Sequence, residues 1–450
     1  MAILRTLSRL FHATATPDLM TLKHTLTPLL LAAILFMSAA PSPARAEGSL
    51  EERIVRLEGE LAELKALLQA RPAATTTSPV PSPASPQTAK PAVTAAPGVN
   101  VRLYGFARFD GSYDTGRLTP GNIALYAAPG SDGDAEWNLT GNATRIGMDL
   151  SGPDTEAMKL SAKIEFDFFG GGTENAANPR LRHGYLKAYW PKSDLSIIAG
   201  QTWDLNSSLI PFVDDAGLMW DAGNIGGRHP QVRFTKGFKA GDKERVEVAV
   251  AAARTIGELY PTTDTGKDAD IPTFQGRVAW TGPVLVADKP ATIAASGHYG
   301  QEQWDLDASN THITADTWSA CLELSMPLSQ KLLFAGECFT GSNLENYWGG
   351  IGQSLGSTGN ETRAQGGWAA LRYSLSPSTA VALGAGVDDP ENSDLTAGSR
   401  SFNRTIFANV IESITPNFIL GLQLSQWKTG YIGSSDSDVW RTQTSLTYTF

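Results

Sequence analysis

The sequence is poor in cysteine and in charge, and most of its length has no long hydrophobic run. Its 450 residues include only 2 cysteines, and Asp, Glu, Lys and Arg make up 18% of the chain, which is below the usual quarter. After residue 46 no apolar run reaches the roughly 18 residues that a transmembrane helix requires. These absences leave two classes open: a soluble protein of two or three domains, or one large β-barrel with appendages.

Cysteine and histidine are too sparse for a disulfide framework, a metal site or a recognisable catalytic group. Cys321 and Cys338 fall in neighbouring predicted strands, where alternation points Cys321 inward and Cys338 outward. The histidines beyond residue 46 are His183, His229, His298 and His312. No motif places any of them beside a serine or a carboxylate, as a hydrolase would require. We therefore predict that the protein is not an enzyme and uses no cofactor.

The first 46 residues have the features of a signal peptide. Basic residues precede the apolar stretch 29–36 (LLLAAILF), and small residues lead to a cleavage site at 44–46. Met20 is an alternative start. Removal of residues 1–46 takes away four basic residues and one acid, leaving 32 Lys and Arg against 45 Asp and Glu, a net charge of −13. Such an acidic chain is not expected to bind nucleic acid.

Residues 47–70 carry an apolar seam of heptad spacing with charged residues between its members, which predicts a coiled-coil helix. The seam consists of Leu50, Ile54, Leu57, Leu61, Leu64 and Leu68. It spans fewer than three heptads, so it would be marginal alone, and barrels assembled side by side would stabilise it. A single amphipathic helix on a surface is the alternative. Residues 71–99 follow with seven prolines among Ala, Thr and Ser, a composition that predicts an extended linker.

Residues 100–450 read as strands throughout. In 158–169 (MKLSAKIEFDFF), apolar side chains alternate with charged ones, so the two sets lie on opposite faces of a strand. Short connections alternate strictly with mostly long ones such as 115–142, 204–230 and 340–367. Outer-membrane barrels have short periplasmic turns and long external loops. The pattern therefore predicts an all-β fold, a transmembrane antiparallel β-barrel of about 16 strands, in preference to a soluble sandwich.

The last strand and four tryptophans fit the same barrel. The chain ends VWRTQTSLTYTF, with Tyr448 two residues before the terminal Phe450, which resembles the closing strand of bacterial outer-membrane barrels and predicts an assembly signal. The edge strand of a sandwich is the alternative. The outward-facing tryptophans Trp190, Trp280, Trp318 and Trp440 lie beside short turns or long loops. They predict an aromatic girdle at each membrane interface.

Alternation assigns many basic side chains to the interior of the barrel. They are Arg102, Arg108, Arg145, Lys159, Lys163, Lys187, Arg233, Arg277, Arg372, Arg404 and Arg441. The planar fork of arginine suits carboxylate and phosphate ligands, so a basic lumen would favour anionic solutes. In the alternative interpretation these arginines pair with inward-facing acids and only hold the wall in shape. Those acids are Glu165, Asp167, Glu323 and Glu337.

One long loop, 204–230, is richer in apolar residues than the others, so we expect it to fold against another part of the protein. Inside the barrel it would narrow the pore and place charged residues at the constriction. The candidates are Asp214, Asp215, Asp221 and Arg228. Packing on a neighbouring subunit is the alternative.

Several segments together resemble the DcaP-like trimeric porins of Gram-negative outer membranes. They are YGFARFDGSYD (104–114), TRIGMDL (144–150), KIEFDFFGG (163–171), RLRHGYLKAY (180–189), AGQTWD (199–204) and the terminal TYTF. The resemblance implies a homotrimer in the outer membrane, with a periplasmic coiled coil, that passes small, often negatively charged solutes. It makes Arg102, Arg145, Arg182 and Arg233 the first choices for the solute path. Outer-membrane lipids and the barrel-assembly machinery are the other expected partners.

Two other functions stay open from the sequence. One is a structural tether, in which a plugged barrel holds the helix and the linker. The other is a phosphate-selective or general porin, because such porins share the same strand pattern.

Overall fold

The computed structural model describes residues 93–96, 98–171, 176–254, 269–305, 311–355 and 360–450. The segments predicted for residues 1–46 and 47–70, including the seam from Leu50 to Leu68, lie outside the described residues, as does nearly all of the predicted linker. Among the residues that are described, no helix is long and apolar enough to span a membrane.

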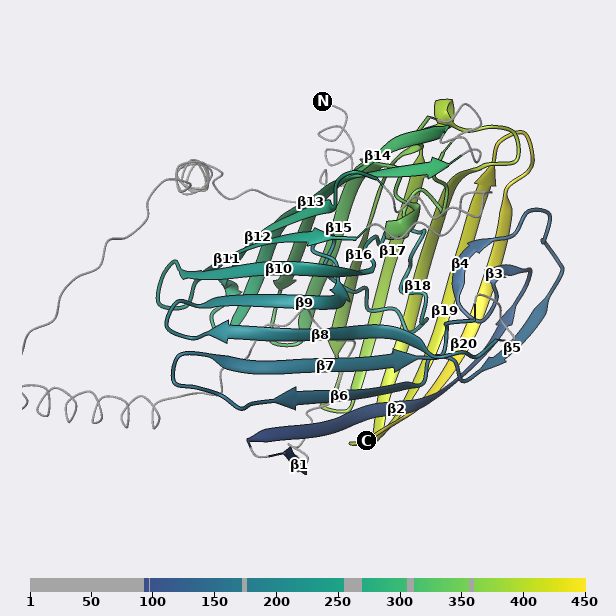
Figure 1. Cartoon of the computed structure of the whole chain (residues 1–450). Coiled ribbons are helices and arrows are strands. Elements are labelled where there is room, and N and C mark those ends of the chain that lie inside the picture. Colours follow the sequence, from purple (N-terminus) through teal and green to yellow (C-terminus); the bar gives the residue numbers. More distant parts are fainter. Residues whose placement is uncertain (1–92, 97, 172–175, 255–268, 306–310, 356–359) are drawn as a thin grey trace, which may run out of the picture. The chain divides into compact units, whose positions relative to one another are not determined.

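Nearly all regular structure in the described residues is β-strand, as Figure 1 shows. The strands are β1 (Val93–Ala96), β2 (Val99–Asp114), β3 (Leu118–Pro120), β4 (Ala124–Ala127), β5 (Glu136–Thr140), β6 (Arg145–Ser151), β7 (Lys159–Asp167), β8 (Arg180–Trp190), β9 (Leu195–Trp203), β10 (Arg228–Lys239), β11 (Arg245–Ala253), β12 (Thr273–Val286), β13 (Lys289–Asp305), β14 (His312–Pro327), β15 (Leu332–Ser342), β16 (Arg363–Ser374), β17 (Thr379–Pro390), β18 (Arg400–Thr415), β19 (Phe418–Tyr431) and β20 (Ser437–Thr449). Two short 3-10 helices, η1 (Glu345–Tyr347) and η2 (Asn392–Asp394), lie in loops.

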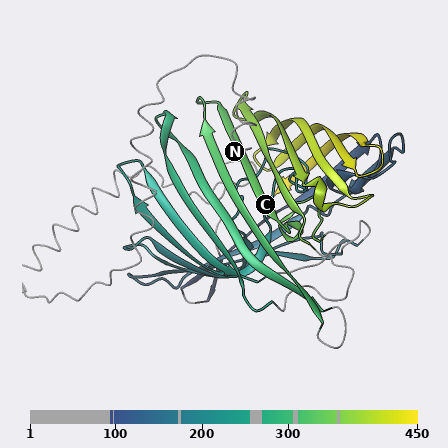
Figure 2. The same ribbon diagram turned by 90° about the horizontal axis from the view of Figure 1, so that it is seen from above.

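Sixteen of these strands close into one antiparallel barrel. From β6 to β20 each strand pairs with the next. The ring closes because β2 pairs with β6 on one side and with β20 on the other (Figures 1 and 2). Closure leaves no free edge among the sixteen strands. The predicted all-β barrel of about 16 strands is therefore confirmed.

The remaining strands belong to the loop that follows β2 and to the start of the described chain. β1 forms a hairpin with β2, and β3 pairs with β4 as a separate two-stranded sheet. β5 pairs with the C-terminal end of β2, at Asp110–Asp114, and β6 pairs with its N-terminal part, at Asn100–Phe106. The wall position next to β2 is therefore built from two segments, with Gly141–Thr144 between them.

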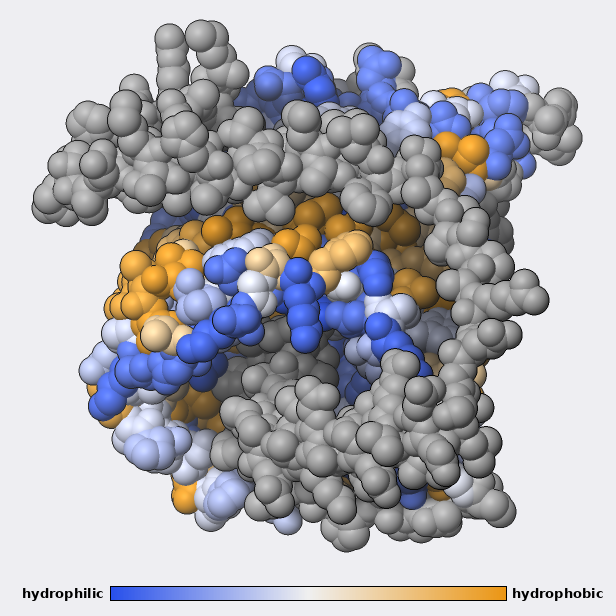
Figure 3. Space-filling model, turned by 90° about the vertical axis from the view of Figure 1, so that its left-hand side faces the viewer, coloured by the Kyte–Doolittle hydropathy of each residue, from blue (hydrophilic) through white to orange (hydrophobic). Residues whose placement is uncertain are grey.

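Alternation separates an inner and an outer face along each strand. In β20, Trp440 is 41% exposed on the outer face, whereas Arg441 is 1% exposed on the inner face. Cys321 is buried and Cys338 is exposed, and both are free thiols, so their predicted orientations are confirmed. In the view of Figure 3, hydrophobic residues (orange) lie beside hydrophilic ones (blue).

Short turns and longer loops alternate around the barrel, as the sequence predicted. Some strands are longer than side-chain alternation alone indicates. β12 continues to Val286 and β13 begins at Lys289, so the turn between them is very short. At its other end β13 extends to Asp305, and β14 begins at His312. Backbone pairing therefore continues beyond the point at which side-chain alternation is regular.

Candidate functional site

Cations gather on one side of the inner wall, on β2, β6, β7 and β8. We call this set the cation ladder: Arg102, Arg145, Lys163, Arg180 and Arg182. Three carboxylates lie among them, Asp149, Glu165 and Asp167. Five cations against three carboxylates give the ladder and these carboxylates together a formal charge of +2.

At one end of the ladder, Asp149 is shared between two cations. It forms ion pairs with Arg102 and with Lys163, whose Nζ lies 2.7 Å from Asp149 Oδ1. Lys163 also donates a hydrogen bond of 2.8 Å to the hydroxyl of Tyr104. The side chains of Arg102 and Lys163 keep 42% and 25% of their surface exposed. Both cations therefore remain accessible from the interior of the barrel.

In the middle of the ladder, Glu165 is the carboxylate for several donors. Arg182 Nε donates to Glu165 Oε1 at 2.7 Å, and the Tyr104 hydroxyl donates to Oε2 at 2.8 Å. Arg145 Nε lies 3.5 Å from Glu165 Oε1 and is buried without a hydrogen-bond partner among the described residues. Arg145 is thus the ladder cation whose hydrogen-bonding capacity is least used.

At the other end, Asp167 holds two arginines. Arg180 donates to both of its carboxylate oxygens, at 2.9 Å and 2.7 Å, and Arg182 Nη1 donates to Oδ2 at 2.9 Å. Arg180 was missed from the sequence, because it stands at the first residue of its strand, before any alternation can be read. Its side chain remains 29% exposed, so it extends the accessible ladder by one residue.

The other predicted lumen arginines lie apart from the ladder. Arg277 forms a bidentate pair with Glu323, and Arg108 pairs with Asp110 and with Asp214. Arg233 donates to Gln231 and to a backbone carbonyl, and Arg372 lies 5.8 Å from the ring centroid of Phe212. Among the described residues neither Arg233 nor Arg372 forms an ion pair.

One basic residue faces the other way. Arg404 is exposed between buried Asn403 and buried Thr405, so its predicted inward position is wrong. The same strand has buried Phe407 on its inner face, where it packs with residues of the 204–227 segment. Because an apolar side chain lies inside here, the usual rule of apolar-out and polar-in gives the wrong face for β18.

The segment 204–227 begins between β9 and β10 and contacts the inner face of strands on the other side of the ring. Leu209 N–H donates to Glu337 Oε1 at 2.6 Å, and the Ser207 hydroxyl donates to Oε2 at 2.7 Å. The Trp368 indole also donates to Glu337, at 2.9 Å. The carboxylate of Glu337 is therefore held by three neutral donors and by no lumen arginine among the described residues.

Apolar packing holds the same segment against the wall. One buried cluster contains Leu209, Val213 and Met219 from the segment together with Ala335, Trp368, Ala370, Ala382 and Phe407 from the strands. Gly223 has φ +110°, and a Cβ there would collide with the backbone carbonyl of Gly367. Glycine is therefore required at this position for the close approach of the two backbones. We call the inner faces of β14–β20 under this segment the covered wall.

The predicted constriction residues are buried or half-buried, and two of them, Asp214 and Asp215, anchor the segment through ion pairs with Arg108 and Arg441. Asp215 accepts from Arg441 at 2.9 Å, and Arg441 also binds Asp114 at 2.8 Å. Asp221 is buried, and burial raises the pKa of its carboxyl to about 7. Arg228 lies over Trp203 and over the indole of Trp220, 4.4 Å and 5.7 Å from their ring centroids.

Two further loops join this packing. The β3–β4 hairpin contributes Ile123 and Leu125 to a cluster with Trp220, while Trp220 stacks on Trp348 with centroids 4.6 Å apart and an interplanar angle of 8°. In the loop of Trp348, Glu345 is buried next to Glu302, and Asn346 donates to both carboxylates, at 3.3 Å and 2.7 Å. Burial and then the charge of Glu302 raise the pKa of Glu345 to about 8.

The predicted surface residues lie where an outer face requires. Trp318 and Trp440 are 38% and 41% exposed, while Trp190 and Trp280 are half-buried. In the last strand, Tyr448 and Phe450 are 56% and 40% exposed, and Phe450 exchanges two backbone hydrogen bonds with Gly105 of β2. Their roles in a girdle and in assembly stay predictions.

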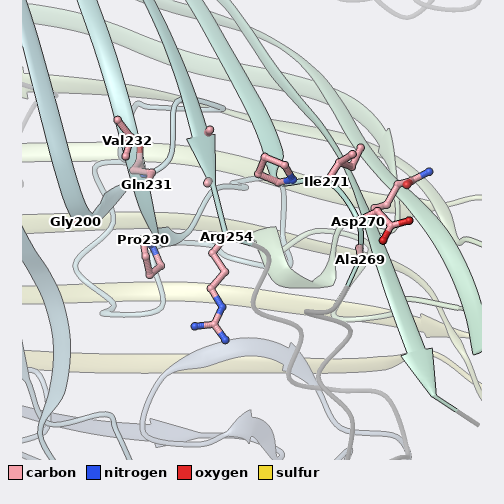
Figure 4. Close-up of a pocket in the computed structure, with 12 residues that line it drawn as sticks. Gly200, Pro230, Gln231, Val232, Arg254, Ala269, Asp270 and Ile271 are labelled. Atoms are coloured by element: carbon pink, nitrogen blue, oxygen red, sulfur yellow. The ribbon is translucent and has the colours of Figure 1, made fainter. Parts of the chain in front are cut away.

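A cavity of about 500 Å³ lies near the ends of β9 to β13, between Gly200, Val232, Arg254 and Ile271 (Figure 4). None of the ladder cations lines it. No group of three or more His, Cys, Asp or Glu side chains that could hold a metal ion occurs in the described part of the chain. The ladder is therefore the strongest candidate site.

The barrel is similar to solved outer-membrane channels. The outer membrane channel DcaP of Acinetobacter baumannii is 20% identical over 80% of this chain and 99% of its own, with a TM-score of 0.65. An anion-selective porin from Comamonas acidovorans is 12% identical over 78% of this chain and 100% of its own, with a TM-score of 0.53. The similarity in fold to DcaP that the sequence predicted is confirmed. No protein-family model matches the chain, and no curated protein matches it.

Proposed function

We propose that this protein is an outer-membrane porin of a Gram-negative bacterium through which small hydrophilic, anionic solutes diffuse. The observation that carries the proposal is the cation ladder, in which five cations face three carboxylates and several cations stay accessible. An excess of fixed positive charge attracts anions and repels cations along a narrow path. Because guanidinium groups bind carboxylates through paired hydrogen bonds, carboxylate solutes are the class that suits the ladder best.

The outer face supports a position in a membrane. Large apolar side chains are exposed on strands all around the ring, for example Leu103, Phe234, Leu322 and Leu422, at 61%, 46%, 59% and 49%. Exposure of such an apolar belt to water would cost free energy, whereas in a bilayer the belt faces lipid tails. Outer-membrane lipids are therefore the proposed surroundings, with the half-exposed tryptophans as the interfacial girdle.

The contacts of segment 204–227 support a narrowed lumen. Its hydrogen bonds reach Glu337 on β15, Gln423 on β19 and Arg108 on β2, which are strands far from its own position in the ring. A segment anchored at these points runs inside the barrel and leaves the ladder wall as the open side. Asp215 and Asp221 are each only 2% exposed, so these two predicted constriction residues contribute little accessible charge to this path.

The N-terminal regions complete the proposal. We assign residues 1–46 to a signal peptide, 47–70 to a periplasmic coiled-coil helix and 71–99 to a linker, with the barrel at 100–450 assembled as a homotrimer. Phe450 and Tyr448 are the proposed signal for the barrel-assembly machinery, since the last strand must pair with β2 before the edges of the barrel disappear.

A second candidate function is a structural tether with a plugged barrel. The observation that favours it is the packing of three loops with one another, through Leu125, Trp220 and Trp348. A phosphate-selective or general porin is the third candidate, because guanidinium groups also bind phosphate. These candidates differ in conductance and in the anion that they prefer.

Single-channel recording of the purified full chain in a planar bilayer tests the proposal. We expect discrete conductance steps, a reversal potential that shows anion selectivity in a KCl gradient, and a higher permeability for succinate than for phosphate. Absence of conductance would favour the plugged tether. Conductance with cation selectivity would contradict the proposed role of the ladder, and a preference for phosphate would favour the phosphate-selective porin.

A further inference from the structure

Aromatic rings accompany the cations of the ladder on the same inner wall. Lys163 Nζ lies 4.4 Å from the ring centroid of Tyr104, and Arg102 Cζ lies 5.7 Å from it. Arg145 Cζ lies 5.1 Å from the centroid of Phe106. Guanidinium and ammonium groups are attracted to the faces of aromatic rings at such distances. The wall therefore offers positive charge and aromatic surface side by side.

Arg145 and Phe106 are the pair best suited to bind a solute. They are direct partners in the register of β2 and β6, so their side chains leave neighbouring backbones on the same face. Arg145 keeps 30% of its side chain exposed, and among the described residues it donates no hydrogen bond, because Arg182 and Tyr104 hold Glu165. Because Nε of Arg145 is buried, the fork formed by its two Nη groups is the part available for another carboxylate.

A carboxylate in the plane of that fork accepts two parallel hydrogen bonds. If the same solute carries an aromatic ring, the ring gains contact with the aromatic surface of Phe106 and with the cation that lies over it. A saturated solute of the same size and charge gains the ion pair and loses the interaction between rings. The pair therefore distinguishes two anions that a purely electrostatic path would treat alike.

We propose that Arg145 and Phe106 form a specificity site for aromatic carboxylates. Arg145 binds the carboxylate and Phe106 contacts the ring. The inference rests on the proposed anion path and adds the chemical class of solute that this path prefers. Phe106 is then a specificity-determining residue, although it carries neither charge nor a hydrogen-bonding group.

Benzoate and cyclohexanecarboxylate are matched probes, since they share charge and ring size and differ in aromaticity. We expect the wild-type channel to be at least about threefold more permeable to benzoate, measured by bi-ionic reversal potentials against chloride. Phe106→Leu should bring the ratio close to one without changing the selectivity between chloride and potassium. Arg145→Lys, which keeps the charge and removes the fork, should lower the permeability of both carboxylates relative to chloride.

Phe109→Leu is the matched control, because Phe109 lies on the outer face of the same strand and is 43% exposed. It should keep the wild-type ratio. Equal permeability of the two probes in the wild type, or a ratio that Phe106→Leu leaves unchanged, would overturn the inference while the anion path stands. A channel without anion selectivity would instead overturn the proposed function itself. Phe106→Met replaces Phe106→Leu if the latter fails to form heat-modifiable barrels.

Discussion

Carboxylates on the two sides of the inner wall, Glu165 and Asp167 on one and Glu337 on the other, are held by different kinds of donor. On the ladder wall, Glu165 and Asp167 are held by arginines, of which Arg182 is buried while Arg145 and Arg180 keep 30% and 29% of their side chains exposed. On the covered wall, Glu337 is held by an amide, a hydroxyl and an indole, all neutral donors. The first arrangement leaves surplus positive charge beside the path, and the second removes a charge from contact with solvent.

The difference comes from what covers each wall. Segment 204–227 supplies backbone N–H groups and apolar side chains to β14–β20, whose inner faces carry Ala335, Ala370 and Ala382 as small packing partners. On the ladder wall the inner residues are long and charged, and they bond with one another across neighbouring strands. In the proposed porin, a solute would therefore meet an electrostatic surface on one side and a packed loop on the other.

The largest effect is expected at the ion pairs that join the segment to the barrel. Arg441→Met would leave Asp114 and Asp215 buried without their partner, at a cost of about 3–5 kcal/mol, since all three side chains are almost fully buried. The temperature at which heat-modifiable barrels unfold should fall markedly. The control Arg363→Met removes an ion pair with Asp394 in which the arginine is exposed and should lower this temperature much less, because exposed ion pairs contribute little to stability. Equal losses for both variants would contradict the anchoring role.

The charge of the ladder wall is the next contrast to test. Replacing Arg102, Arg145 and Arg180 together with Gln changes the formal charge of the ladder from +2 to −1. We expect the anion-to-cation permeability ratio to fall about tenfold, which corresponds to roughly 1.4 kcal/mol. Reversal potentials in a KCl gradient measure it. The matched control is Arg404→Gln, on the outer face of β18, and a shift of similar size in that variant would refute the ladder as the cause.

The loop that contains Glu345, next to the covered wall, should become less stable at alkaline pH. Its pKa is raised to about 8 by burial and then by Glu302, so the folded loop holds a proton that the released loop would lose. The stability of the folded loop relative to the released loop is therefore highest at low pH. It decreases as pH rises from the ordinary glutamate range, and the part that depends on the Glu345 proton is lost above about 8. We expect amide exchange in 343–355, corrected for the intrinsic rate, to increase severalfold between pH 6 and pH 9.

Glu345→Gln should remove most of that pH dependence, because the amide stays neutral. Glu391→Gln, an exposed acid in another loop, should keep it. If both variants retain the wild-type profile, the titrating group lies elsewhere.

The smallest expected effect concerns the contact between two loops. Trp348→Leu removes the stacking on Trp220 and should cost about 0.5–1.5 kcal/mol beyond the area that it exposes. Thermal unfolding of the barrel and the frequency of spontaneous current steps both measure the loss. Trp137→Leu, at a side chain that is 77% exposed, should change neither quantity, and a matching change would show that the stacked pair has no special role.

Much of the barrel could be predicted from local patterns. The alternation in β7 and in β20 placed Lys163 and Arg441 on the inner face, and the sequence of short and long connections indicated the number of strands. Arg180 was missed because it begins its strand, and Arg404 was assigned to the wrong face because buried Phe407 lies on the inner face of β18. Both errors arise where local alternation ends or is inverted by a contact from a distant segment.

By itself the sequence determined most of the strands and most of their faces, because a period of two acts between adjacent residues and needs no tertiary information. Only the tertiary structure decided which inner residues stay open and which are covered. Leu209 and Glu337 are 128 positions apart, yet a hydrogen bond between them helps to hold that carboxylate beneath segment 204–227. Alternation tells which side of a strand a residue faces, and the fold alone decides what lies opposite it.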